Sequence, residues 1–277
     1  YTISAKIGAK LTKWIDFNYS SRWIRQEYER PADLADGLYQ NLARQGWPNL
    51  PYYDPNGYLF SSPSPALGLR DRGQDKYQKD WLYQQAQLVL EPIQNWKTFA
   101  EFNYRTEDNF RHWDNQVTYN HDALGNPIPY STSSAVFEEA SKANYSNINI
   151  YSEYFKSFND THNFKVMAGF QSEDFKYRML SAKKDGIQVP GYPVLDDTTG
   201  LDDKGNPVPP EAKGYYDDWS MAGFFGRINY DYLGRYLLEV NLRYDASSRF
   251  RRDKRWDFFP SFSFGWNIAR EDFWKEN

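Results

Sequence analysis

The chain has 277 residues, of which 40% are hydrophobic, 25% charged and 19% aromatic. Its 33 basic and 37 acidic residues are mixed along the sequence and leave a net charge of −4, which argues against a nucleic-acid partner because such proteins carry a basic surface. The absence of cysteine excludes disulfides, zinc–thiolate sites and a thiol nucleophile. The sequence contains no run of about 18 apolar residues, so it predicts no membrane-spanning helix. The aromatic content favours strands.

Residues 1–23 predict a β-hairpin. From Tyr1 to Leu11 every second residue is apolar, and the residues between them are Thr, Ser, Lys or Gly. A turn near Lys13 leads to a second alternating strand that ends near Trp23. Because successive side chains of a strand point to opposite faces, each strand has one apolar and one polar face.

Long polar segments and short turns then alternate along the chain. The alternating pattern is lost over residues 29–76, 112–141 and 183–218, where Pro, Gly, Asn and Asp are frequent. It returns at 77–91, 100–107, 148–154 and 164–173, and three more alternating strands fill 223–266. The short turns lie near Lys13, Asn95, Asp160 and Gly234, and the long segments follow Tyr28, Phe110 and Leu180, with a shorter one after Phe250.

This arrangement predicts part of a large transmembrane β-barrel. Short turns at one end of the strands and long loops at the other are typical of outer-membrane barrels. Trp14, Trp96, Tyr232 and Trp266 lie near the short turns, where an aromatic girdle is expected. About nine antiparallel strands are counted, and an odd number does not fit a complete bacterial barrel. We therefore expect residues 1–277 to be part of one barrel domain within a longer protein.

Six charged residues on the polar side of the strands are predicted to face the barrel lumen: Glu101, Arg105, Glu153, Glu239, Arg243 and Asp245. Arg243 and Asp245 are in addition candidates for contact with a substrate. The alternative interpretation is that they form hydrogen bonds that hold neighbouring strands and the barrel contents in register. A pair of catalytic carboxylates would require a defined separation and different environments. No catalytic, metal-binding or cofactor-binding residue is predicted.

An aromatic loop is the second candidate site. Trp47, Tyr52, Tyr53 and Tyr58 lie within the segment WPNLPYYDPNGY. Exposed aromatic rings stack on sugars or anchor a partner protein. Packing of these rings within the loop itself is the alternative, and the sequence does not separate the two.

Three motifs carry a family resemblance: GRINYDYLGRYLLE (226–239), RYDASSRF (243–250) and RWDFFPSFSFGW (255–266). They closely resemble the SusC/RagA family of TonB-dependent outer-membrane transporters. The resemblance implies a 22-stranded barrel closed by an N-terminal plug, so that the plug domain and the last strands are absent from residues 1–277.

The resemblance also implies the function and the partners. These are import of bulky nutrients, either oligosaccharides or peptides, energised by TonB, with a SusD-like surface lipoprotein as a lid and outer-membrane lipid around the barrel. Two other hypotheses stay open from the residues. One is a secreted all-β protein that binds or hydrolyses glycans, and the other is a simple diffusion porin.

Overall fold

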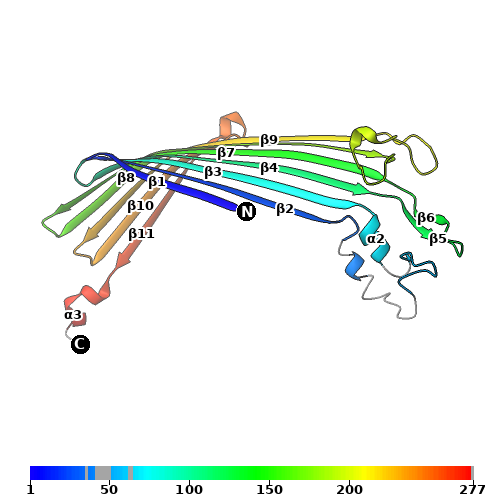
Figure 1. Cartoon of the computed structure of the whole chain (residues 1–277). Coiled ribbons are helices and arrows are strands. Elements are labelled where there is room, and N and C mark those ends of the chain that lie inside the picture. The colour runs from blue at the N-terminus through cyan, green and yellow to red at the C-terminus, as the bar shows by residue number, and fades with distance from the viewer. Residues whose placement is uncertain (35–36, 41–50, 62–64, 276–277) are drawn as a thin grey trace.

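A single curved sheet of long strands dominates the computed structural model (Figure 1). The structure describes residues 1–34, 37–40, 51–61 and 65–275. The sheet contains nine strands, and a separate two-stranded hairpin lies beside the loops at one end. The strands are β1 (Thr2–Thr12), β2 (Ile15–Pro31), β3 (Gln74–Ile93), β4 (Trp96–Asn115), β5 (Thr118–His121), β6 (Pro127–Ser131), β7 (Ala135–Phe158), β8 (His162–Asp185), β9 (Glu211–Tyr232), β10 (Tyr236–Ser247) and β11 (Trp256–Trp266).

The few helices are short and lie outside the sheet. They are α2 (Ala66–Asp71), α3 (Asp272–Lys275) and the 3₁₀ turns η1 (Leu195–Asp197), η2 (Arg252–Lys254) and η3 (Ile268–Arg270), and residues 37–40 are also helical. Among the residues that the structure describes, no helix is long and apolar enough to cross a membrane.

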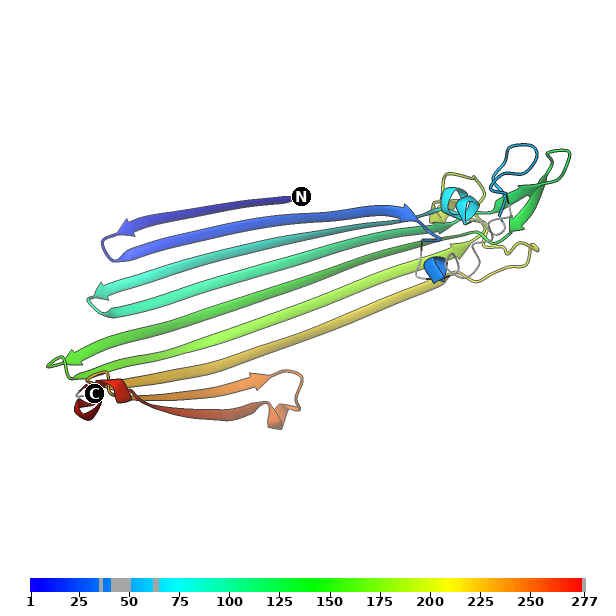
Figure 2. The same ribbon diagram turned by 90° about the horizontal axis from the view of Figure 1, so that it is seen from below.

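The nine strands follow one another in the order β1-β2-β3-β4-β7-β8-β9-β10-β11, and every neighbouring pair is antiparallel. Figure 2 shows the short turns at one end of the strands, while α2 and the β5–β6 hairpin lie at the opposite end. We call these the turn end and the loop end. The four predicted short turns are confirmed. At three of them residues adopt the left-handed conformation: Asn95, Asn159, Asp160 and Gly234, which are of the types that tolerate it well, and also Leu233.

The strands extend further toward the loop end than the sequence pattern predicts. The segment 112–141, expected to be a loop, contains the end of β4, the β5–β6 hairpin and the start of β7. Strands β8 and β9 likewise enter the expected loop 183–218. The alternation of apolar and polar residues is lost here because each face of these extensions carries both apolar and polar side chains, although the backbone pairing continues.

The pairing register of the strands confirms that the sheet has one apolar and one polar face. Residues directly opposite each other in an antiparallel pair have side chains on the same face. One row crosses all nine strands and carries mainly apolar side chains: Ala9, Phe17, Leu88, Ala100, Ile150, Phe170, Phe224, Tyr244 and Phe258. We call this face the apolar face. The polar face consists of the even-numbered residues of β1 and β2 and the odd-numbered residues of the other seven strands.

The apolar face becomes charged toward the loop end. A row there crosses Arg25, Asp80, Asp108, Lys142, Arg178 and Tyr216. Toward the turn end the same face ends in aromatic residues such as Trp96, Tyr154, Tyr236 and Trp266. An apolar band of limited height with aromatic residues at its rim is the surface that a lipid bilayer requires.

The sheet lacks the core of a globular domain. Among the described residues only Leu59, Leu67, Ala135 and Val136 are buried hydrophobic residues, and they lie at the loop end. Phe262 and Phe264, on the apolar face of β11, are each 71% exposed. Such an area of apolar surface is stable only against another apolar medium. The fold therefore agrees with the predicted barrel segment rather than with a sandwich.

Candidate functional site

All six predicted charged residues lie on the polar face. Glu101 and Asp245 belong to one row, which also contains Asn149 and Gln171. Arg105, Glu153, Glu239 and Arg243 have the same parity on their strands. The alternation seen in the sequence therefore places these side chains on one surface, from β4 to β10.

The three glutamates are engaged by neighbouring strands. Glu101 accepts hydrogen bonds from Gln87 Nε2 (2.7 Å) and Asn149 Nδ2 (3.4 Å). Glu153 pairs with Lys165 Nζ at 2.9 Å. Glu239 accepts hydrogen bonds from the amides of Asn229 (2.6 Å) and Asn241 (2.7 Å). These contacts support the interpretation that the carboxylates hold strands in register.

Arg243 and Arg105 differ in whether an acidic side chain pairs with them. Arg243 forms a two-pronged ion pair with Asp245, two residues along the same strand, at 2.9 and 3.0 Å. Arg105 faces no acidic side chain within ion-pair distance in the described part of the chain, and its guanidinium lies 5.5 Å from the centre of the Tyr145 ring. Among the six predicted charged residues, Arg105 is therefore the one without a counter-charge in the part of the chain that the structure describes.

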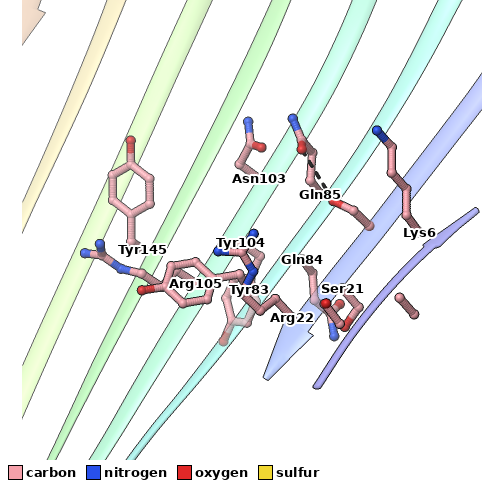
Figure 3. A pocket seen from close by; sticks show the side chains of 13 residues that line it. Lys6, Ser21, Arg22, Tyr83, Gln84, Gln85, Asn103, Tyr104, Arg105 and Tyr145 are labelled. Atoms are coloured by element: carbon pink, nitrogen blue, oxygen red, sulfur yellow. Dashed lines mark hydrogen bonds between the residues drawn. The ribbon is translucent and has the colours of Figure 1, made fainter. Parts of the chain in front are cut away.

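Three hollows open on the polar face. They have volumes of about 690, 360 and 450 Å³. The largest lies over β1, β2, β3, β4 and β7 and includes Arg105 and Tyr145 (Figure 3). The second includes Glu153 and the third Glu239. The polar face thus offers recesses of the size that small ligand groups occupy.

The aromatic loop divides into packed and free rings. Tyr58 stacks on His121, which follows Asn120 in β5, with ring centres 3.7 Å apart. Tyr52 and Tyr53 are 62% and 58% exposed. Trp47 lies outside the described residues. Within this loop, packing accounts for Tyr58 and leaves Tyr52 and Tyr53 as candidate contacts.

The loop is attached to the β5–β6 hairpin by polar contacts. Asn56 Nδ2 donates to the carbonyl oxygen of Asp122 at 2.9 Å. Ser61 and Asn120 exchange two hydrogen bonds, of 3.1 and 2.8 Å. The sequence did not predict this attachment, because the partners are about 60 residues apart and carry no pattern that relates them.

A charged cluster fixes the loop ends of β2, β3 and β4. Asp75, whose side chain is only 3% exposed, is bound by Arg30 (2.9 Å) and Arg111 (2.9 Å). Burial alone would raise the pKa of Asp75, but the hydrogen bonds and charges of Arg111 and Arg30 outweigh it and hold that pKa below its usual range. This cluster was missed at the sequence level, since its members lie in segments without alternation.

The described residues contain no group of three or more His, Asp or Glu side chains placed to hold a metal ion. The chain forms a turn at Asp202. Asp202 Oδ1 accepts hydrogen bonds from the backbone N–H of Lys204 (2.9 Å) and Asn206 (2.7 Å).

Comparison with known proteins agrees with this geometry. No protein-family model matches the chain. The TonB-dependent receptor SusC of Bacteroides thetaiotaomicron is 33% identical over 128 residues, which are 46% of this chain and 12% of that protein. The TonB-dependent receptor P39 of Formosa agariphila is 29% identical over an alignment of 290 positions, which covers 99% of this chain and 25% of that protein. The chain is similar in sequence to SusC and to other TonB-dependent receptors.

Solved structures show the same fold. A structure of the RagAB peptide transporter superposes on the whole of this SusC-like chain with a TM-score of 0.75 at 15% identity, and the match covers 31% of that chain. The RagAB peptide importer in its open-open state gives a TM-score of 0.76 over 98% of this chain. The chain thus spans about a third of that solved chain and a quarter or less of the curated relatives named here. It is a segment of an outer-membrane β-barrel.

Proposed function

We propose that this SusC-like segment forms part of the wall of an active importer of bulky nutrients, either oligosaccharides or peptides. The observation that carries the proposal is the two-faced sheet. Its apolar face suits lipid, and its polar face, with charged residues and three hollows, suits a lumen through which a polar ligand passes. The names of the relatives support energy supply by TonB.

The proposal includes a surface lipoprotein of the SusD type as a lid. The loop end of the barrel carries the exposed rings of Tyr52 and Tyr53 on a loop that is itself anchored to the β5–β6 hairpin. A rigid, exposed aromatic pair is suited to an interface because little side-chain freedom is lost on binding. The solved RagAB complex, which this chain resembles in fold, supports an assembly of this kind.

Uptake by living cells tests the import. We expect cells that carry the full-length protein to accumulate fluorescent oligosaccharides or peptides, and cells without its gene to lose this uptake. Disruption of TonB should abolish uptake to the same extent, because a plugged barrel does not conduct large solutes by diffusion. Uptake that continues without TonB would instead indicate a diffusion porin. Recovery of the full-length protein as a soluble, secreted monomer would contradict the barrel itself.

Alanine substitution tests the lid contact. We expect the double variant Tyr52→Ala/Tyr53→Ala to weaken binding of the lipoprotein, or of the ligand, on the order of tenfold. The matched control is Tyr216→Ala, which removes a 60% exposed tyrosine from the apolar face of β9. Affinity is measured on the purified full-length protein in detergent. Equal affinities for the two variants would remove Tyr52 and Tyr53 from the interface.

A further inference from the structure

The largest hollow on the polar face is lined by positive charge without negative charge. It has a volume of about 690 Å³ and lies over five adjacent strands (Figure 3). The cations Lys6, Arg22 and Arg105 line it, and the described residues that line it include no acidic side chain. Its other polar-face side chains are neutral: Ser4, Ser20, Tyr83, Gln85, Asn103 and Tyr145.

These cations differ from others on the same face. Lys79 pairs with Glu107 at 2.6 Å, Lys165 with Glu153 at 2.9 Å, and Arg243 with Asp245 at 2.9 Å. Within the described residues, neither Arg22 nor Arg105 lies within 4.0 Å of a carboxylate oxygen. Glu107, two residues beyond Arg105, is already paired with Lys79. Glu173 lies in the row of Asn103 but two strands away, on β8, and its carboxylate accepts a hydrogen bond from the hydroxyl of Tyr145, a lining residue of the hollow.

The two arginines flank a tyrosine. Arg22, Tyr83 and Arg105 lie directly opposite one another on β2, β3 and β4, and Tyr145 follows on β7. Strands are about 4.8 Å apart, so the arginine backbones are separated by roughly 10 Å. Two like charges at this distance repel each other across a concave wall, and an anion between them would relieve the repulsion. Lys6 lies on the edge strand β1 and adds its positive charge to those of the two arginines.

The position of the hollow suits a ligand that enters from the loop end. On the apolar face, Trp23 and Leu82 lie one position nearer the loop end than Arg22 and Tyr83. The charged pair Arg25–Asp80, at 2.8 Å, comes next. The hollow therefore lies on the polar face, at the level where the apolar band of the other face ends toward the loop end. A ligand that enters from the loop end reaches this level early.

The lining favours a saccharide over a peptide. The amides of Gln85 and Asn103 and the hydroxyls of Ser4 and Ser20 are the groups that bind sugar hydroxyls, and Tyr83 offers a ring to a sugar face. The one aliphatic side chain among the lining residues is Ala5, so the hollow has no apolar recess for peptide side chains. Arginine forks match the paired oxygens of carboxylate and sulfate groups.

We propose that Arg22 and Arg105, assisted by Lys6, bind carboxylate or sulfate groups of an acidic oligosaccharide on its way through the barrel. The proposal rests on the proposed importer function and narrows its substrate class. Uptake of a neutral cargo by the wild type would leave the importer function intact even if the anion site failed.

Binding of matched probes to the purified full-length protein tests the site. The probes are a galacturonate hexamer, a sulfated galactose hexamer, a neutral galactose hexamer and a glutamate hexapeptide, and affinity is measured by calorimetry in detergent. We expect at least one acidic saccharide to bind about tenfold more tightly than the neutral hexamer. The carboxylate and sulfate probes decide which of the two groups the arginines prefer.

The variants assign the preference to the arginines. Arg22→Gln/Arg105→Gln should remove the preference for the acidic saccharide over the neutral hexamer. Lys10→Gln, the matched control, removes an exposed cation from the polar face of β1 outside the hollow and should have no effect. Arg22→Lys/Arg105→Lys retains the charges and should restore part of the preference. Folding of each variant is checked by heat-modifiable migration on gels.

A second measurement does not depend on a variant. In the wild type, added salt should weaken binding of the acidic saccharide and leave the neutral hexamer unaffected, because salt screens the arginine charges. Equal binding of acidic and neutral saccharides, or no binding of either, would overturn the proposal. So would a preference that survives in Arg22→Gln/Arg105→Gln. Arginine-dependent binding of the glutamate peptide alone would replace the saccharide by an acidic peptide.

Discussion

Replacement of Asp75 by alanine in the full-length protein is expected to lower the free energy of unfolding by about 2–4 kcal/mol. The Asp75 side chain is buried, and it is the shared partner of Arg30 and Arg111. Its removal takes away the carboxylate that both guanidiniums bind at the junction of β2, β3 and β4. Unfolding in denaturant, followed by heat-modifiable migration, measures the effect.

The matched control is Asp108→Ala. Asp108 also forms an ion pair across two strands, with Lys142 at 2.9 Å, but both side chains are about half exposed. An exposed pair contributes less than about 1 kcal/mol because water already solvates its charges. Equal losses for Asp75→Ala and Asp108→Ala would show that burial of the Asp75 cluster has no energetic importance.

The same cluster predicts a dependence on pH. The pKa of Asp75 is lower in the folded protein than in an unfolded chain, so the folded state binds the proton less tightly. Its stabilising contribution is therefore fully present above the ordinary aspartate pKa of about 3.9 and is lost as the pH falls through the lower, folded-state value. We expect the difference between wild type and Asp75→Asn to be constant from neutral pH down to about 5 and to shrink below about 4. A difference that grows on acidification would contradict this assignment.

Substitution of Gly169 is the second change with a large expected effect. Gly169 lies on the polar face of β8, directly between Tyr151 of β7 and Phe225 of β9. A Cβ atom there would lie 2.5 Å from both Tyr151 Cβ and Phe225 Cζ and 2.8 Å from the carbonyl oxygen of Ile150. Because the backbone oxygen cannot turn away as a side chain can, we expect Gly169→Ala to destabilise the protein by about 1–3 kcal/mol.

Gly214→Ala is the control for Gly169→Ala. Gly214 lies on the neighbouring strand β9, and the nearest atom to a Cβ there would be the carbonyl oxygen of Met179 at 3.9 Å, an ordinary contact. Alanine at this position should leave the midpoint of unfolding unchanged or raise it slightly, because a strand glycine loses more conformational freedom on folding than alanine does. If Gly169→Ala unfolds at the same denaturant concentration as Gly214→Ala, the crowding around Gly169 is not a constraint.

Much of the fold was predictable because its signals are local. The alternation of residues such as Ile148 and Ile150 with Asn147 and Asn149 depends only on the geometry of a single strand. The turns at Asn95 and Gly234 are marked by residues that accept the left-handed conformation. The strand ends were predicted less well, since β7 continues to Ala135 through a stretch where three apolar residues and then two glutamates replace the alternation.

The candidate sites were predictable in part. The parity of Glu101, Arg105 and Glu239 placed them on the polar face, but parity does not reveal which charges are paired. Glu239 is held by two asparagines, whereas Arg105 has no counter-charge in the described residues. The separation of Tyr58 from Tyr52 also required the structure, since the position of the β5–β6 hairpin decides which ring stacks on a partner.

The sequence by itself determined the strand faces, the alternation of short turns and long loops, and the family motifs between Gly226 and Trp266. These properties arise from neighbours along the chain, where the strand period and the turn residues act directly. The tertiary structure decided which residues from distant strands lie opposite each other. That register places Arg22 and Arg105 on either side of Tyr83 and binds Asp75 to Arg30 and Arg111. Charge compensation depends on distance in space, so it was determined only when the strands were paired.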